Sequence, residues 1–160
     1  MKIVLFSDSH GNVRNMSRAL EKHKNAELVI HLGDCVSDVL RLQELHGGFK
    51  YEFVQGNNDW ARGYPAEKTL ELEGKKIFIT HGHNYNVKYD YQRIAARGRA
   101  AGADAVFFGH THEPEEFFSE GMLVLNPGSI GGTSGNSGRP VYCTVEVTKE
   151  KIVARHFGIN

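Results

Sequence analysis

The chain has 160 residues, and its 19 lysines and arginines balance its 19 aspartates and glutamates, so the formal net charge at pH 7 is zero. This length allows a core to be buried in one domain, and we expect a single domain over residues 1–160. Balanced charge excludes a general electrostatic attraction to extended nucleic acid or to anionic membranes. Two cysteines without a CxxC motif, no signal-peptide core and no run long enough to span a bilayer favour a cytoplasmic protein.

The first third of the chain alternates between apolar runs and amphipathic segments. The apolar runs that predict buried strands are residues 2–7, 27–32 and 50–55. The helices predicted between them have apolar positions at Val13, Met16 and Leu20 in the first and at Val36, Val39, Leu40 and Leu45 in the second. This βαβαβ order favours a mostly parallel sheet covered by helices.

The later part of the chain adds antiparallel material. Residues 69–73 and 75–80 flank Gly74 and predict a hairpin, and a helix is predicted at about 89–101. Further strands are predicted at residues 105–108, 116–119, 122–125, 141–147 and 152–157. We therefore expect a four-layer α/β (α+β) fold, in which two packed sheets carry helices on their outer faces. The glycine-rich stretch 131–138 either borders a substrate or is a mobile connection.

Five short polar stretches follow the apolar runs. They are Asp8-Ser9-His10, Gly33-Asp34, Gly56-Asn57-Asn58-Asp59, Thr80-His81-Gly82-His83 and Gly109-His110-Thr111-His112. In the first and last of these, potential metal ligands stand at i and i+2, and such residues face the same side of an extended segment. Because sites in α/β folds form at strand ends, we expect the five stretches to converge on one site.

Some of these residues also have purely structural interpretations. Asp8 or Asp34 could cap the helix that follows it, and residues 56–59 make a good turn sequence. Asp59 could either orient a ligand or close that turn. His31 lies inside an apolar strand, and we expect it either in the core or orienting a metal-bound imidazole. The metal interpretation therefore depends on the whole set of stretches and not on any single one.

The potential ligands indicate the chemistry. Their seven positions are Asp8, His10, Asp34, Asn57, His81, His110 and His112. Aspartate, asparagine and histidine together suit manganese, iron, zinc, cobalt or nickel better than calcium or magnesium. Seven ligands are too many for one ion and fit two divalent ions, for which manganese is our first expectation. Asp34 is the natural bridge, because one carboxylate can give an oxygen to each ion. Two such ions would share a water, lower its pKa and present hydroxide for in-line attack on a phosphate ester.

Taken in order, the five stretches resemble the motifs of the calcineurin-like metallophosphoesterases. The short chain and its Asn126-Pro127-Gly128-Ser129 segment resemble the small prokaryotic phosphodiesterases of that family. The resemblance implies a double β-sandwich flanked by helices, and a phosphodiesterase that hydrolyses P–O bonds. It also implies that one ion is held by Asp8, His10, Asp34 and His112, and the other by Asp34, Asn57, His81 and His110.

One position departs from the family pattern. Many members carry a histidine directly after the metal-binding asparagine, where it contacts phosphate or protonates the leaving oxygen, and here that position is Asn58. An amide donates a hydrogen bond but is not a general acid near neutral pH. His83 is the nearest other candidate in the sequence for supplying that proton. The expected catalytic residues are therefore Asp34, Asn58 and His83.

Other functions remain open from sequence alone. A phosphomonoesterase or a nucleotide-processing hydrolase would use the same ligands, and a non-catalytic scaffold like the retromer subunit would use the same fold to bind proteins. A scaffold has no physical need for seven matched ligands, which favours the enzyme. We expect a small phosphodiester substrate as the partner. A homo-oligomer is also open, because four aromatic residues either form an interface or belong to the core: Trp60, Tyr64, Phe117 and Phe118.

Overall fold

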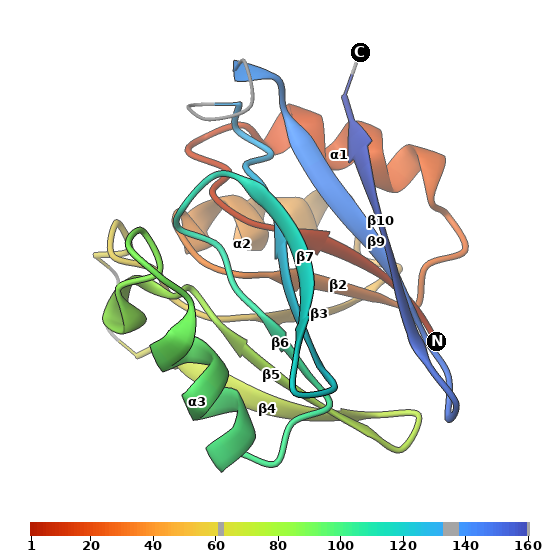
Figure 1. Ribbon diagram of the computed structural model, residues 1–160. Helices are drawn as coiled ribbons and strands as arrows, with labels where there is room; N and C mark the ends of the chain where they lie inside the picture. The colour runs from red at the N-terminus through yellow and green to blue at the C-terminus, as the bar shows by residue number, and fades with distance from the viewer. Residues whose placement is uncertain (61–62, 133–137, 160) are drawn as a thin grey trace.

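The structure is a computed structural model that describes residues 1–60, 63–132 and 138–159. Most of the stretch 131–138, for which a substrate border or a connection was expected, lies outside these described residues. Within them, ten strands form two five-stranded sheets, and helices cover the outer face of each sheet (Figure 1). The four-layer double sandwich expected from the sequence is confirmed.

The first sheet has the strand order β10-β9-β1-β2-β3. Its strands are β1 (Lys2–Phe6), β2 (Leu28–His31), β3 (Lys50–Phe53), β9 (Val141–Val147) and β10 (Ile152–Gly158). The three N-terminal strands are parallel, whereas β9 runs antiparallel to β1 and β10 runs antiparallel to β9. The βαβαβ opening of the chain therefore forms the parallel half of this sheet, as the alternation of apolar runs predicts.

The second sheet has the strand order β4-β5-β6-β8-β7. Its strands are β4 (Glu67–Leu72), β5 (Lys75–Thr80), β6 (Ala105–Phe107), β7 (Pro114–Ser119) and β8 (Met122–Pro127). Strands β5, β6 and β8 are parallel, and the edge strands β4 and β7 join them through hairpins. The turn between β4 and β5 uses Gly74 at φ 78°, a left-handed conformation that glycine adopts without a steric penalty.

Alternating side chains of the central strands serve two different layers. In β1, Ile3 and Leu5 belong to the apolar core between the sheets, whereas Val4 and Phe6 pack in the layer beneath α1 (Val13–Lys22) and α2 (Val36–Leu45). All four side chains are fully buried. A strand covered on both faces needs a continuous apolar run, which explains the strand signal in the sequence.

Helix α3 (Gln92–Ala100) covers the second sheet, where Ile94 and Ala95 join Phe78 and Val106 in a buried cluster. Helix and sheet approach closely at Gly98, because a Cβ there would lie 2.2 Å from Cγ2 of Val106. The helix starts three residues later than the predicted residue 89. Ahead of it lies a short 3-10 helix, η1 (His83–Tyr85), which is followed by Asn86 in the left-handed region at φ 55°.

Several apolar residues lie elsewhere than the sequence pattern indicates. Leu40 and Leu45 of α2, expected on its inner face, are 39% and 54% exposed. Phe117 packs against Tyr91, whereas Phe118 on the opposite face of β7 is exposed. Trp60 is exposed as well.

In the described part of the chain, no helix combines the length and the hydropathy that a bilayer crossing requires.

Candidate metal centre

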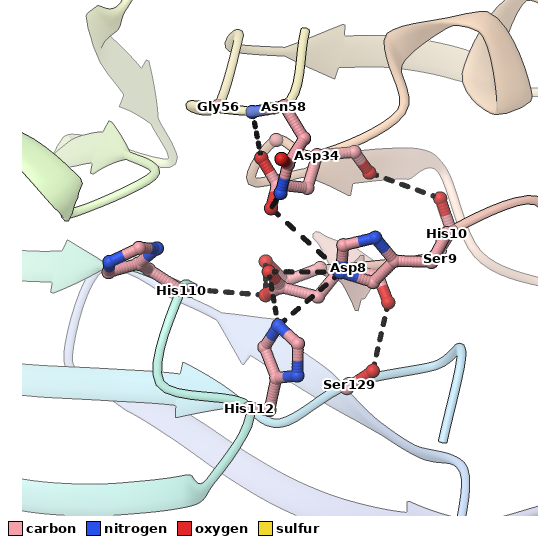
Figure 2. Close-up of polar contacts among 12 residues, drawn as sticks. Asp8, Ser9, His10, Asp34, Gly56, Asn58, His110, His112 and Ser129 are labelled. Carbon is pink, nitrogen blue, oxygen red and sulfur yellow. Dashed lines mark hydrogen bonds and ion pairs between the residues drawn. The ribbon is translucent and has the colours of Figure 1, made fainter. Parts of the chain in front are cut away.

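The five polar stretches meet where parallel strands of both sheets end. Asp8 follows β1, Asp34 follows β2, His81 follows β5 and His110 follows β6. Backbone hydrogen bonds join these loops: the Asp8 amide donates to the Gly33 carbonyl at 3.1 Å within the first sheet. One contact between the loops of the two sheets is made by the His110 amide, which donates to Oδ2 of Asp8 at 3.0 Å (Figure 2). Segments 102 residues apart thus converge on one carboxylate.

A first group of ligand atoms consists of Asp8, His10, Asp34 and His112, and one donor atom from each lies within 4.8 Å of those of the other three. Nε2 of His112 is 3.1 Å from Oδ1 of Asp8, and Nε2 of His10 is 3.9 Å from the same oxygen. The two Nε2 atoms of His10 and His112 are 3.4 Å apart. Two carboxylates and two imidazoles at these separations can surround one divalent ion.

A second group forms on the other side of Asp34. Nε2 of His81 lies 3.3 Å from Oδ1 of Asp34 and 3.0 Å from Oδ1 of Asn57. The ring of His110 points away from Asp8 (Figure 2), and its centroid is 5.0 Å from that of His81. The other Asp34 oxygen, Oδ2, lies 3.8 Å from Nε2 of His10 in the first group. One carboxylate therefore presents a separate oxygen to each group.

The ligand pairs at i and i+2 reach their places without an extended backbone. Every member of the first group has a positive φ: 54° at Asp8, 45° at His10, 62° at Asp34 and 62° at His112. His110 is also left-handed, at 69°, and its ring lies beside that of His81, while His112 belongs to the first group. The premise that both side chains of a pair share one face of an extended segment was wrong. A non-glycine residue with left-handed backbone angles carries strain, and such residues are typical of functional sites.

The buried carboxylate of Asp8 supports a bound cation. Its Oδ2 accepts hydrogen bonds from the Ser7 hydroxyl at 2.5 Å and from the His110 amide. Its Oδ1 is buried and accepts no well-aligned hydrogen bond, although an unpaired buried acceptor is costly. That oxygen faces the Nε2 atoms of His10, His81 and His112. A divalent ion held by the first group would satisfy it together with the nitrogens of His10 and His112, so the donor set fits a metal.

Electrostatics keep the two carboxylates in the charged form that binds metals. Burial raises the pKa of Asp34, but hydrogen bonding and charge from His81, together with hydrogen bonds from Asn58, hold it well below its usual range. Burial also raises the pKa of Asp8, and contact with His112 and the charge of His81 outweigh it, so this pKa is lowered too. Burial, followed by the charge of His81, lowers the pKa of His110 to about 4. A neutral imidazole is the form that ligates a metal. Burial lowers the pKa of His81, but the hydrogen bond to Asp34 and the charge of Asp8 outweigh it and raise this pKa, so a metal bound there would displace a proton.

The segment 56–59 holds Asp34 from two directions. The Asn58 amide donates to Oδ1 of Asp34 at 2.9 Å, and its side-chain Nδ2 donates to Oδ2 at 2.7 Å. The carboxylate of Asp59 accepts from the backbone amides of Gly56 at 2.7 Å, Asp34 at 3.0 Å and Val36 at 2.6 Å. Asp59 therefore closes its turn, orients a ligand and caps α2. Asp34 is not a side-chain cap of α2, because the cap residue is Cys35.

Asp8 does not cap a helix either, because the N-cap of α1 is Asn12, whose Oδ1 accepts a hydrogen bond from the Asn15 amide at 3.2 Å. The Asp8 carboxylate therefore makes no capping contact with α1 and is available to the site.

His83 lies beside the second group, with its ring centroid 5.4 Å from that of His81. Its Nδ1 is buried without a hydrogen-bond partner among the described residues.

Sequence reasoning missed how β8 supports the site. The buried side chain of Asn126 donates through Nδ2 to the Gly109 carbonyl at 3.0 Å and to the Thr111 hydroxyl at 2.9 Å, which fixes the loop that carries His110 and His112. Its Oδ1 accepts from the Gly128 amide, so this segment forms a tight turn. The Ser129 hydroxyl donates to the Asp8 carbonyl at 2.9 Å. The Asn126-Pro127-Gly128-Ser129 segment was the only sequence signal for this support.

Comparisons with known proteins agree with this geometry. The calcineurin-like phosphoesterase superfamily domain matches residues 1–150. YsnB of Bacillus subtilis, a probable metallophosphoesterase, is 33% identical over 132 residues, which cover 81% of this chain and 75% of the relative. A structure described as a novel archaeal phosphodiesterase is 28% identical, has a TM-score of 0.78 and covers 99% of this chain and 100% of its own.

Vps29 from Entamoeba histolytica, solved in complex with zinc, has a TM-score of 0.81 with 100% of both chains covered. At 19% identity that likeness concerns the fold alone. The family model, by contrast, spans nearly all of the sequence and includes every polar stretch from which the site is built. The resemblance seen in the five stretches is confirmed, and the chain belongs to the calcineurin-like phosphoesterase superfamily.

Proposed function

We propose that this protein is a phosphodiesterase that works with two divalent metal ions. The observation that carries the proposal is Asp34, whose Oδ1 lies 3.3 Å from His81 and whose Oδ2 lies 3.8 Å from His10. A carboxylate that faces two imidazole groups with different oxygens suits a bridge between two ions. The unpaired Oδ1 of Asp8 supports a cation in the first group.

The ligands divide between the ions as follows. The first ion would be held by Asp8, His10, Asp34 and His112, and the second by Asp34, Asn57, His81 and His110. Manganese is our first choice, and nickel, zinc, iron and cobalt suit the same donors. The ligand types accept all of these ions, so the cellular supply would decide among them.

When bound, the two ions lower the pKa of water and offset the negative charge on phosphate oxygens. The chain itself has three tasks in this reaction. Asp34 presents one carboxylate oxygen to each ligand group, and Asn58 holds that carboxylate through its backbone amide and its side chain. His83, beside His81, is our candidate for protonating the leaving oxygen, because the Asn58 amide cannot do so. The nucleophile that attacks phosphorus would then be water, in line with the leaving group, and no serine or cysteine nucleophile would be needed.

A diester is favoured as the substrate class by the archaeal phosphodiesterase, which is similar to this chain over 99% of its length. A phosphomonoesterase or a nucleotide-processing hydrolase is the alternative within enzymes. A retromer-subunit-like scaffold is the non-catalytic alternative, and the matched ligand set argues against it. A cytoplasmic location agrees with the two free cysteines, Cys35 and Cys143.

The proposal is tested by hydrolysis of bis(p-nitrophenyl) phosphate beside p-nitrophenyl phosphate. Chelator-stripped protein is supplied with manganese, nickel, zinc or magnesium, one at a time, and bound metal is counted in the same samples. We expect metal-dependent hydrolysis of the diester with little of the monoester. The opposite preference would favour a phosphomonoesterase. Two bound ions per chain without hydrolysis of either ester would favour the scaffold.

A further inference from the structure

Beneath the first ligand group, three buried polar side chains connect the loops that carry it. They are His31 at the end of β2, Ser9 between Asp8 and His10, and Asp38 in the first turn of α2. The Ser9 hydroxyl donates to Oδ2 of Asp38 at 2.7 Å, and Nε2 of His31 lies 3.1 Å from the same hydroxyl. The same Asp38 oxygen accepts from the Gly11 amide at 2.8 Å.

Donors and acceptors along this network match one another. Nδ1 of His31 accepts from the Gly33 amide at 3.2 Å, so the ring proton belongs on Nε2, where it is donated to Ser9. Burial lowers the pKa of His31 to about 4, in keeping with this neutral tautomer. The Ser9 hydroxyl then donates its hydrogen bond to the Asp38 carboxylate. Each group has a partner, which is the condition under which a buried polar network makes its surroundings rigid.

The network ends on the backbone that positions the first group. Gly11 adjoins His10, and Gly33 adjoins Asp34, so both loops are tied to α2 and β2 from below. Ser9 itself separates Asp8 and His10, which are held at φ 54° and 45°. Asp34 is common to both groups, but His81 of the second group is held by a different contact, with its Nδ1 at 2.8 Å from the Leu32 carbonyl.

We propose that Ser9 and Asp38 are positioning residues that set the affinity of the first ligand group for its metal ion, separately from the second group. They touch neither the ion nor the substrate, and they act by holding Asp8 and His10 in left-handed conformations that a free loop would leave. This inference rests on the proposed two-ion function, and it adds a dependence that the ligand list alone does not contain.

The test measures metal binding to the chelator-stripped full chain, by competition with a fluorescent chelator and by counting bound ions. Partners that orient metal ligands are typically worth about 10–100-fold in affinity, so Ser9→Ala and Asp38→Ala should each weaken one ion by about that factor. The other ion should keep its affinity within about threefold. The double variant should bind that ion with the same affinity as the single variant that binds it less tightly, because both changes remove the same connection.

Two further variants separate positioning from general damage. Asp38→Asn keeps a carbonyl oxygen that can accept from Ser9 and Gly11, so it should restore most of the lost affinity. Asp104→Asn is the matched control, because Oδ2 of Asp104 accepts the Lys76 amide at 2.8 Å near the start of β5, at the end of the strand away from His81. This control should bind both ions as the wild type does. Thermal melting of the metal-free proteins shows that each variant is folded.

The proposal is overturned if folded Ser9→Ala and Asp38→Ala bind both ions as tightly as the wild type, or if they weaken both ions equally. A wild type that binds only one ion would contradict the two-ion function. The role of Ser9 and Asp38 would then stand if that one affinity falls in both variants, and fail if it does not. Failure of this inference and failure of the proposed function are therefore distinguishable.

Discussion

Replacing Gly56 with alanine should disrupt the metal centre by displacing Asp34. A Cβ at this position would lie 2.2 Å from Oδ1 of Asp34 and 2.5 Å from its backbone nitrogen, whereas carbon contacts in proteins rarely fall below 3.0 Å. Gly56 cannot easily recede, because its amide donates to Asp59 at 2.7 Å and Asp59 also holds the Asp34 amide. The carboxylate that faces both ligand groups must therefore move.

The size of the effect follows from that displacement. Relieving the overlap requires a shift of about 1 Å, and a misplacement of about 1 Å in a catalytic site can cost about 100-fold in rate. Overpacking typically costs about 1–3 kcal/mol in the free energy of unfolding. The reduced entropy of the unfolded alanine chain offsets only about 0.4–1 kcal/mol of that. Activity should consequently fall much more than stability.

The assay compares Gly56→Ala with Gly48→Ala. Gly48 has no atom within 4 Å of an added Cβ, and it does not need a left-handed backbone, so it is a matched substitution with open space around it. Both variants are examined for bound metal, diester hydrolysis and thermal melting. We expect the control to match the wild type, and Gly56→Ala to lose metal and about 100-fold in turnover. Normal metal content and turnover in Gly56→Ala would refute the steric argument.

Three further substitutions test individual roles. Asp34→Asn removes the charge that faces both groups and should release both ions and abolish turnover; substantial activity at normal metal content would contradict the bridge. His112→Ala should weaken one ion more than the other, because its Nε2 belongs to the first group only, and equal loss of both ions in metal analysis would count against that division. His83→Ala should slow a diester with a poor leaving group by about 10²–10⁴-fold and an activated nitrophenyl ester much less. Equal slowing of the two esters would remove His83 as the proton donor.

Much of the fold was predictable because strand and helix signals depend on burial. β1 and β2 are covered on both faces, and only a continuous apolar run satisfies both layers. The exposed Leu40 and Leu45 of α2 show the limit of that reasoning, since a helical pattern does not reveal how wide a face the sheet covers. Phe117 and Phe118 differ in exposure because they point to opposite faces of β7. Which of the two is buried depends on which face of the sheet α3 covers.

The candidate site was only partly predictable, for a different reason. The ligands stand in short local stretches, so their types and order are visible in the sequence. The groups that hold them come from distant positions: Asp38 meets Ser9 across 29 residues, and Asn126 meets Gly109 across 17. An aspartate in a helix and an asparagine in a strand carry no local sign of such partners. Only the packing of α2 and β8 against the ligand loops reveals them.

The backbone conformation at the candidate ligands of the first group explains why aspartate and histidine suit these positions. All four members of the first group are left-handed, and aspartate and histidine are among the few non-glycine residues that enter this region several-fold more often than average. A glycine would adopt the conformation freely but has no ligand atom. Each such residue costs about 1–3 kcal/mol of strain, which persists only where the surroundings over-determine the backbone. We infer that Ser9 and Asp38 beneath the first group, with Asn126 beneath His110 and His112, supply that constraint through their hydrogen bonds. On this proposal the strained backbone and the hydrogen bonds that hold it would orient the candidate ligands before a metal ion binds.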